Sequence, residues 1–96
     1  MSQLNYVLCN EVLDGLRDSE ATVVVISHSG KAEFVRASRS GLFQKGTHTY
    51  LCVGLVGNHD LTKTALIQFP EEADSGANRV WVPQANLVTL PETVPA

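Results

Sequence analysis

Apolar residues recur at steps of three and four over the first sixteen residues of the chain, at Leu4, Val7, Leu8, Val12, Leu13 and Leu16. A repeat of three to four residues is typical of an amphipathic helix that buries one face. Ser2 can cap the start of such a helix, and Asp18 and Ser19 mark its end. The pattern therefore predicts an N-terminal helix with a polar opposite face.

After residue 20 the pattern changes to short runs rich in β-branched and aromatic residues, separated by polar turns. Strands are predicted in the segments ATVVVIS, EFVRAS, HTYLCVGLV, TALIQF, RVWV and the closing VTL. Ser29 and Gly30 form a hairpin turn, RSGLFQKGT is a polar loop with Leu42 and Phe43 packed inward, and PQANL is a single helical turn. We therefore expect a mainly β fold with an N-terminal helix and five to six short antiparallel strands, in one strongly bent sheet or a small barrel.

Length and composition indicate one folded domain. Ninety-six residues with 44% hydrophobic and 18% charged positions fit a single globular domain, predicted over residues 1–90, followed by a flexible tail at 91–96. The longest apolar run, VVVI, is far too short to span a membrane, and the N-terminus lacks the features of a secretion signal. We expect a cytoplasmic location, with Cys9 and Cys52 reduced and buried.

The last part of the chain resembles a known fold. CVGLVGNHDLTKTALIQFPEEADSGANRVWVPQANLVTL, about 40 of the 96 residues, is similar to the end of a small SH3-like barrel. There, two strands joined by a turn precede a short strand, a helical turn and a last strand. The acidic, aromatic-rich loop of signalling SH3 domains is missing, so their peptide groove is not implied. VWVP is also similar to the pore-lining stretch of tetrameric type II dihydrofolate reductases, with the order of Trp and Val reversed and no match at their other site positions.

The residues that usually carry chemistry form no catalytic or metal-binding pattern. His48 and Cys52 are four residues apart on one predicted strand, roughly 13 Å, so local geometry cannot bring both to one zinc ion. Glu71 and Glu72 lie in a polar loop without the apolar pocket that an acid–base pair needs. The order of Gly and Lys at 41–46 is not that of a phosphate-binding loop. We therefore expect no metal and no cofactor, and an enzyme is not favoured.

The net charge of −3 hides a basic segment in the middle of the chain. Residues 28–48 contain four cations against the single carboxylate Glu33; the cations are Lys31, Arg36, Arg39 and Lys45. Such a segment can contact an anion, but four dispersed cations are too few to predict nucleic-acid binding. They remain candidates for weak anion binding.

The strand RVWV, which ends at Pro83, predicts a surface of a different kind. Strand alternation places Val80 and Val82 toward the core and Trp81 on the opposite face. An aromatic residue framed by Arg, Thr and Gln is typical of an interface anchor, and Pro83, which lacks an N–H group, ends the strand pairing. The predicted interface or ligand-binding residues are Thr64, Leu66, Gln68, Arg79 and Trp81.

Three functions follow from these observations. The first is a non-catalytic binding and assembly module, a homo-oligomer (a dimer or a larger ring) that also has a surface for a protein or small-molecule partner. The second, which the reductase resemblance implies, is a small oligomeric enzyme with a site between subunits lined by Trp81, Gln68 and Arg79. The third is a weak nucleic-acid or anion binder that uses residues 28–48. The lack of a catalytic pattern favours the first.

Overall fold

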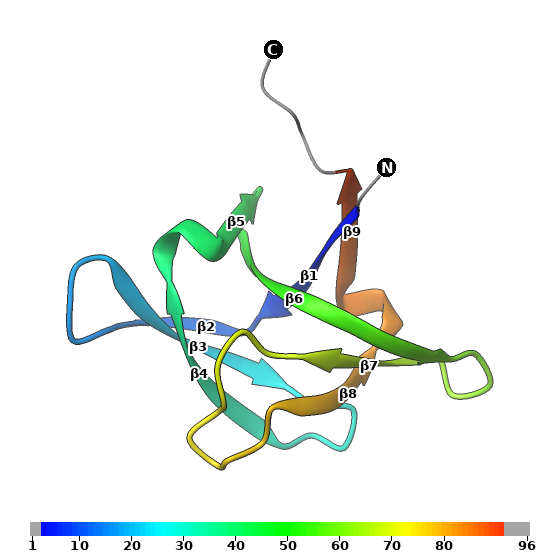
Figure 1. Ribbon diagram of the computed structural model, residues 1–96. Helices are drawn as coiled ribbons and strands as arrows, with labels where there is room; N and C mark the ends of the chain where they lie inside the picture. The colour runs from blue at the N-terminus through cyan, green and yellow to red at the C-terminus, as the bar shows by residue number, and fades with distance from the viewer. Residues whose placement is uncertain (1–2, 92–96) are drawn as a thin grey trace.

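A computed structural model describes residues 3–91 and shows nine strands in two antiparallel sheets (Figure 1). The larger sheet contains β1 (Gln3–Cys9), β5 (Leu42–Lys45), β6 (His48–His59), β7 (Thr64–Gln68), β8 (Arg79–Pro83) and β9 (Leu87–Pro91). Its order is β8-β7-β6-β1-β9, with β5 also paired to β6. The smaller sheet contains β2 (Glu11–Asp14), β3 (Glu20–Ile26) and β4 (Ala32–Ser38), in the order β2-β3-β4. Neither sheet closes into a barrel, so the prediction of one bent sheet or a small SH3-like barrel is wrong.

The predicted N-terminal helix is also wrong, and residues 3–91 contain no α-helix. β1 is instead a central strand that pairs with β6 on one side and with β9 on the other. Val7 is buried on the face toward the core, while Tyr6 and Leu8 lie half-buried on the opposite face. Because both faces of β1 carry apolar residues, its apolar positions also fit a helical repeat. Leu16, placed by that repeat on the buried stripe, is 91% exposed in the turn before β3.

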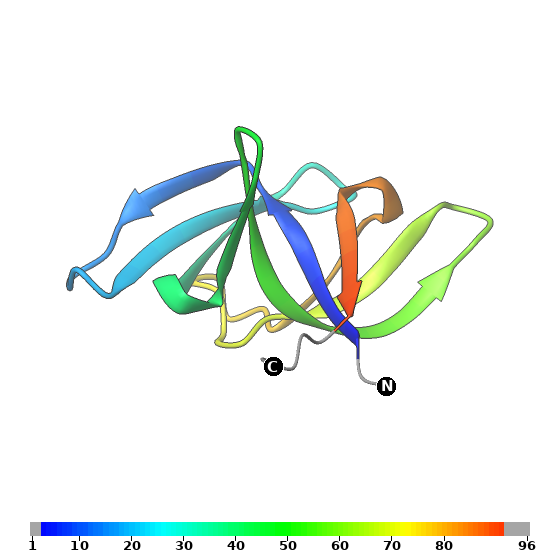
Figure 2. The ribbon, with the colours of Figure 1, turned by 90° about the horizontal axis from the view of Figure 1, so that it is seen from above.

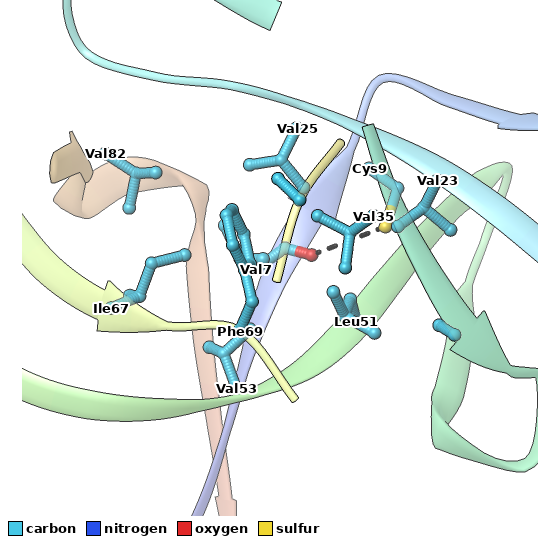
Figure 3. Packing of buried hydrophobic residues seen from close by; sticks show 12 residues of the cluster. Val7, Cys9, Val23, Val25, Val35, Leu51, Val53, Ile67, Phe69 and Val82 are labelled. Carbon is cyan, nitrogen blue, oxygen red and sulfur yellow. Dashed lines mark hydrogen bonds between the residues drawn. The ribbon is translucent and has the colours of Figure 1, made fainter. Parts of the chain in front are cut away.

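The core lies between the two sheets and consists mainly of branched aliphatic side chains (Figure 3). The larger sheet contributes Val7, Cys9, Leu51, Val53, Ile67 and Val82, and the smaller sheet contributes Val23, Val25, Val35 and Ala37. Phe69 and Ala73, from the connection between β7 and β8, complete the cluster. Phe69 is the only aromatic side chain in it, so the core leaves most of the aromatic residues outside.

Several connections hold the two sheets together. The chain passes from β1 into β2 through Asn10, whose backbone N–H donates to the carbonyl of Val24 at 2.7 Å. In the β3–β4 turn, the backbone N–H of His28 donates to the carbonyl of Trp81 on β8, also at 2.7 Å. Figure 2 shows the β2–β3 and β6–β7 hairpins extending away from this junction in opposite directions.

The remaining strand predictions are largely confirmed. β3 and β4 form the expected hairpin, with Gly30 in the left-handed region at φ +88°, and β6 is the longest strand. The helical turn predicted in PQANL is present as Gln84–Asn86 (η2), between β8 and β9. The segment predicted as a polar loop instead contains the 3-10 turn Arg39–Gly41 (η1) and β5. The predicted tail at 91–96 lies outside the described residues, except for the backbone of Pro91.

Candidate functional site

The face of the six-stranded sheet that points away from the core, called the outer face below, carries many apolar side chains that are not fully buried. Its apolar side chains, all half-buried or exposed, are Leu4, Tyr6, Leu8, Phe43, Tyr50, Cys52, Leu66, Trp81, Val88 and Leu90. Of the six aromatic residues in the chain, four lie on this face. Large aromatic side chains outside a core are typical of contact surfaces.

The structure places Trp81 as the sequence predicted. Val82 is fully buried, whereas the Trp81 side chain is 43% exposed on the outer face of β8. Leu66 lies directly opposite Trp81 on β7. At the next pair of positions on this face, the Arg79 Nε–H donates to the Gln68 Oε1 at 3.0 Å. Four of the five predicted interface residues therefore form one surface with a polar rim.

The fifth predicted residue, Thr64, belongs to the same face but is only 3% exposed. Its Oγ1 is 2.7 Å from the Oγ1 of Thr62, which in turn is 2.9 Å from the Nδ1 of His59. The His59 ring meets the Trp81 ring edge-on, with centroids 6.4 Å apart and an interplanar angle of 88°. Together His59, Thr62, Thr64 and Trp81 line a hollow of about 220 Å³, called the Trp81 hollow below. Thr64 is thus part of its wall and presents little surface itself.

A second aromatic group on the outer face was missed by sequence reasoning. Tyr6 and Phe43 have ring centroids 5.4 Å apart, and those of Phe43 and Tyr50 are 6.3 Å apart. Phe43 was expected to pack inward, but it is Leu42 that reaches the core, and Phe43 lies on the other side of β5. The usable signal was the period of two in β5 and β6, which puts Phe43 and Tyr50 on the same face once they are paired.

A larger hollow of about 560 Å³ lies where β6 bends. It is lined by Cys52, Val53, Gly54, Leu55, Val56, Gln68, Phe69 and Pro70, and it contains no charged side chain. The strand pairing of β6 with β7 shifts between Leu55 and Gly57, so the sheet is irregular here. The hollow offers mainly apolar contact, and the Cys52 thiol is the lining group that could act as a nucleophile.

The four candidate anion-binding cations lie on different elements. Arg39 in η1 is already engaged, because its Nε–H donates to the carbonyl of Asp18 at 2.9 Å and its Nη2 is 3.3 Å from the carboxylate of Asp14. Lys31 lies in the β3–β4 turn, Arg36 is exposed on β4, and Lys45 ends β5. In Figure 1 the β3–β4 turn and the β5–β6 turn are at opposite ends of the molecule. The structure therefore does not gather these four cations into one patch.

The thiols and other ligand-type residues are dispersed. Burial raises the pKa of the Cys9 thiol to about 12, so this sulfur stays protonated and unreactive at neutral pH. Cys52 is half-buried on the outer face opposite Tyr6, and the expectation that both thiols are buried holds only for Cys9. Within residues 3–91, no three His, Cys, Asp or Glu side chains are grouped as they would be around a metal ion. The same residues contain no helix long and apolar enough to cross a membrane.

Comparison of the chain with protein-family models, curated proteins and solved structures gives no significant match.

Proposed function

We propose that this protein is a non-catalytic binding and assembly module that self-associates through the outer face of its six-stranded sheet, with Trp81 at the contact. The observation that carries this proposal is the exposure of the only Trp of the chain on an apolar face. Trp is among the residues most often found at the energetic centre of an interface. Arg79 and Gln68 supply the polar rim that such an anchor usually has.

The surroundings of Trp81 support binding more than catalysis. The hydroxyls of Thr62 and Thr64, which line the hollow with it, are hydrogen-bonded to each other, and Thr62 also bonds to His59. Within residues 3–91 no carboxylate is paired with the His59 ring, so the orienting group that a Thr–His nucleophile pair would need is missing. The all-β fold names no function by itself, because small β folds serve many unrelated functions.

The test compares the solution mass of the wild type with that of two variants, measured by light scattering. Trp81→Ala removes the proposed anchor. Phe34→Ala is a matched control, because Phe34 is another aromatic residue with a similar exposure, 40%, but on the smaller sheet. Circular dichroism verifies that both variants fold.

We expect the wild type and the Phe34→Ala variant to be oligomeric. In the Trp81→Ala variant, the dissociation constant of the oligomer should rise by a factor of about 30. That factor corresponds to the roughly 2 kcal/mol that marks an interface hot spot. A wild type that stays a single chain, or a folded Trp81→Ala variant with unchanged association, would contradict the proposal.

A further inference from the structure

The turn between β6 and β7, residues 60–63, contains an apolar residue that is not buried in the folded chain. Leu61 is 93% exposed in this turn. Turns usually carry Gly, Asn, Asp, Ser or Pro, because these residues favour the turn backbone or hydrogen-bond to it. A Leu in such a position contributes almost no burial to the stability of the single chain.

The same turn is held firmly in place. The side-chain amide of Gln84 donates to the Asp60 Oδ1 at 3.3 Å, and the Gln84 backbone N–H donates to the carbonyl of Lys63 at 2.8 Å. The hydrogen bond between His59 and Thr62 closes the turn from the other side. The part of the turn that carries Leu61 is thus held in place, which lowers the conformational entropy lost when Leu61 binds.

The turn also contains backbone strain. Lys63 has φ +56°, the only non-glycine residue among the described ones in the left-handed region. This conformation is unfavourable for such a residue and persists where neighbouring contacts impose it. Strain in a turn that presents an exposed Leu is consistent with a conformation kept for contact with a partner.

The Trp81 hollow lies beside this turn, because His59 and Thr62 line it. Its volume of about 220 Å³ has room for a leucine side chain, and the Trp81 and His59 rings form two walls at right angles. Because Leu61 lies in the chain between His59 and Thr62, which line the hollow, a two-fold rotation can bring the Leu61 of each copy to the hollow of the other. Asp60 and Lys63, on either side of Leu61, carry opposite charges, so a two-fold partner can pair each with its opposite.

We propose that the protein forms a two-fold dimer in which Leu61 of each copy fills the Trp81 hollow of the other. This inference rests on the proposed function and adds to it the partner, a second copy, and the reciprocal contact. Each copy contributes one Leu61 and one hollow, so the contact closes on itself and stops at two chains.

The first test replaces Leu61 by a turn-favouring residue. Leu61→Asn should raise the dimer dissociation constant about a hundredfold, because two leucine side chains per dimer lose their burial. Leu16→Asn is the matched control, since Leu16 is 91% exposed in the β2–β3 turn, and it should leave the dissociation constant unchanged. Sedimentation equilibrium over a range of protein concentrations measures both.

The second test mixes two weakened variants. Leu61→Asn keeps the hollow and loses the protruding side chain, whereas Trp81→Ala keeps Leu61 and loses a wall of the hollow. A mixed dimer has one intact contact, while each variant alone has none. Mixing should therefore restore part of the association.

The outcomes separate this inference from the proposed function. If Trp81→Ala dissociates but Leu61→Asn still forms the wild-type dimer, the outer face is an assembly surface and the Leu61 contact is wrong. If mixing restores no association, the reciprocal contact is also wrong. If the wild type is a single chain at every concentration, both proposals fail.

Discussion

When Val7 and Leu16 are replaced by Ala, one at a time, a strand and a helix at the N-terminus predict different losses of unfolding free energy. In the structure Val7 is fully buried in β1 between the two sheets, and Leu16 is 91% exposed. The helical repeat instead places both residues on one buried stripe. The order of the two destabilisations therefore distinguishes the two structures.

The magnitudes follow from burial. Val7→Ala removes two buried methyl groups, about 0.8 kcal/mol each, and leaves a cavity, which brings the loss in unfolding free energy to about 2–3 kcal/mol. For a domain of this size that loss lowers the melting temperature by about 10–20 °C. Leu16→Ala removes more carbon atoms but almost no buried surface, so its effect should be within about 0.5 kcal/mol.

Urea unfolding, followed by circular dichroism, measures both changes. A change in the midpoint at constant slope reports stability rather than a change in the unfolded state. A Leu16→Ala variant destabilised by 2 kcal/mol or more, or a Val7→Ala variant as stable as the wild type, would refute the placement of β1 in the core.

Three further predictions concern the thiols, a buried carboxylate and a tight turn. A thiol reagent at neutral pH should label Cys52 in the folded protein and Cys9 only after unfolding. The pKa of the Cys9 thiol is about 12 in the folded protein against an ordinary 9.0, so as the pH rises the unfolded state loses this proton first. The unfolding free energy should therefore fall between pH 9 and pH 12. The fall should be smaller in the Cys9→Ala variant, which lacks this thiol. Ser75→Ala removes the 2.6 Å hydrogen bond to the buried Glu33 carboxylate, so urea unfolding should show a loss of about 1–3 kcal/mol, and an unchanged midpoint would contradict this role. Gly15→Ala places a Cβ 2.8 Å from backbone atoms at the start of β3, and thermal unfolding should show a loss of at least about 1 kcal/mol.

Local patterns in the sequence predicted the parts of the fold that local contacts build. The β3–β4 hairpin is joined by a short turn at Gly30, and the helical turn at Gln84–Asn86 lies between adjacent strands. Strand alternation at Trp81 also placed this side chain outside the core, because a period of two needs no knowledge of the partner strand.

The parts that were predicted wrongly depend on contacts distant in the chain. β1 is a strand because it pairs with residues of β6 and β9 that lie 40 or more positions away, and such pairing overrides a helical repeat in Leu4, Val7 and Leu8. The group of Tyr6, Phe43 and Tyr50 was missed for the same reason, since it forms only when β1 and β5 flank β6. Closure into a barrel could not be judged either, because β2, β3 and β4 form a sheet of their own.

The fluorescence of the single Trp, measured over a range of protein concentrations alongside the solution mass, tests the central claim most directly. Trp81 is 43% exposed in the single chain and should be covered on assembly. We predict that its emission shifts to shorter wavelength and that quenching by acrylamide weakens, both with the same midpoint as the rise in mass. A rise in mass with unchanged Trp81 emission and quenching would contradict the account, because the chains would then associate through another surface.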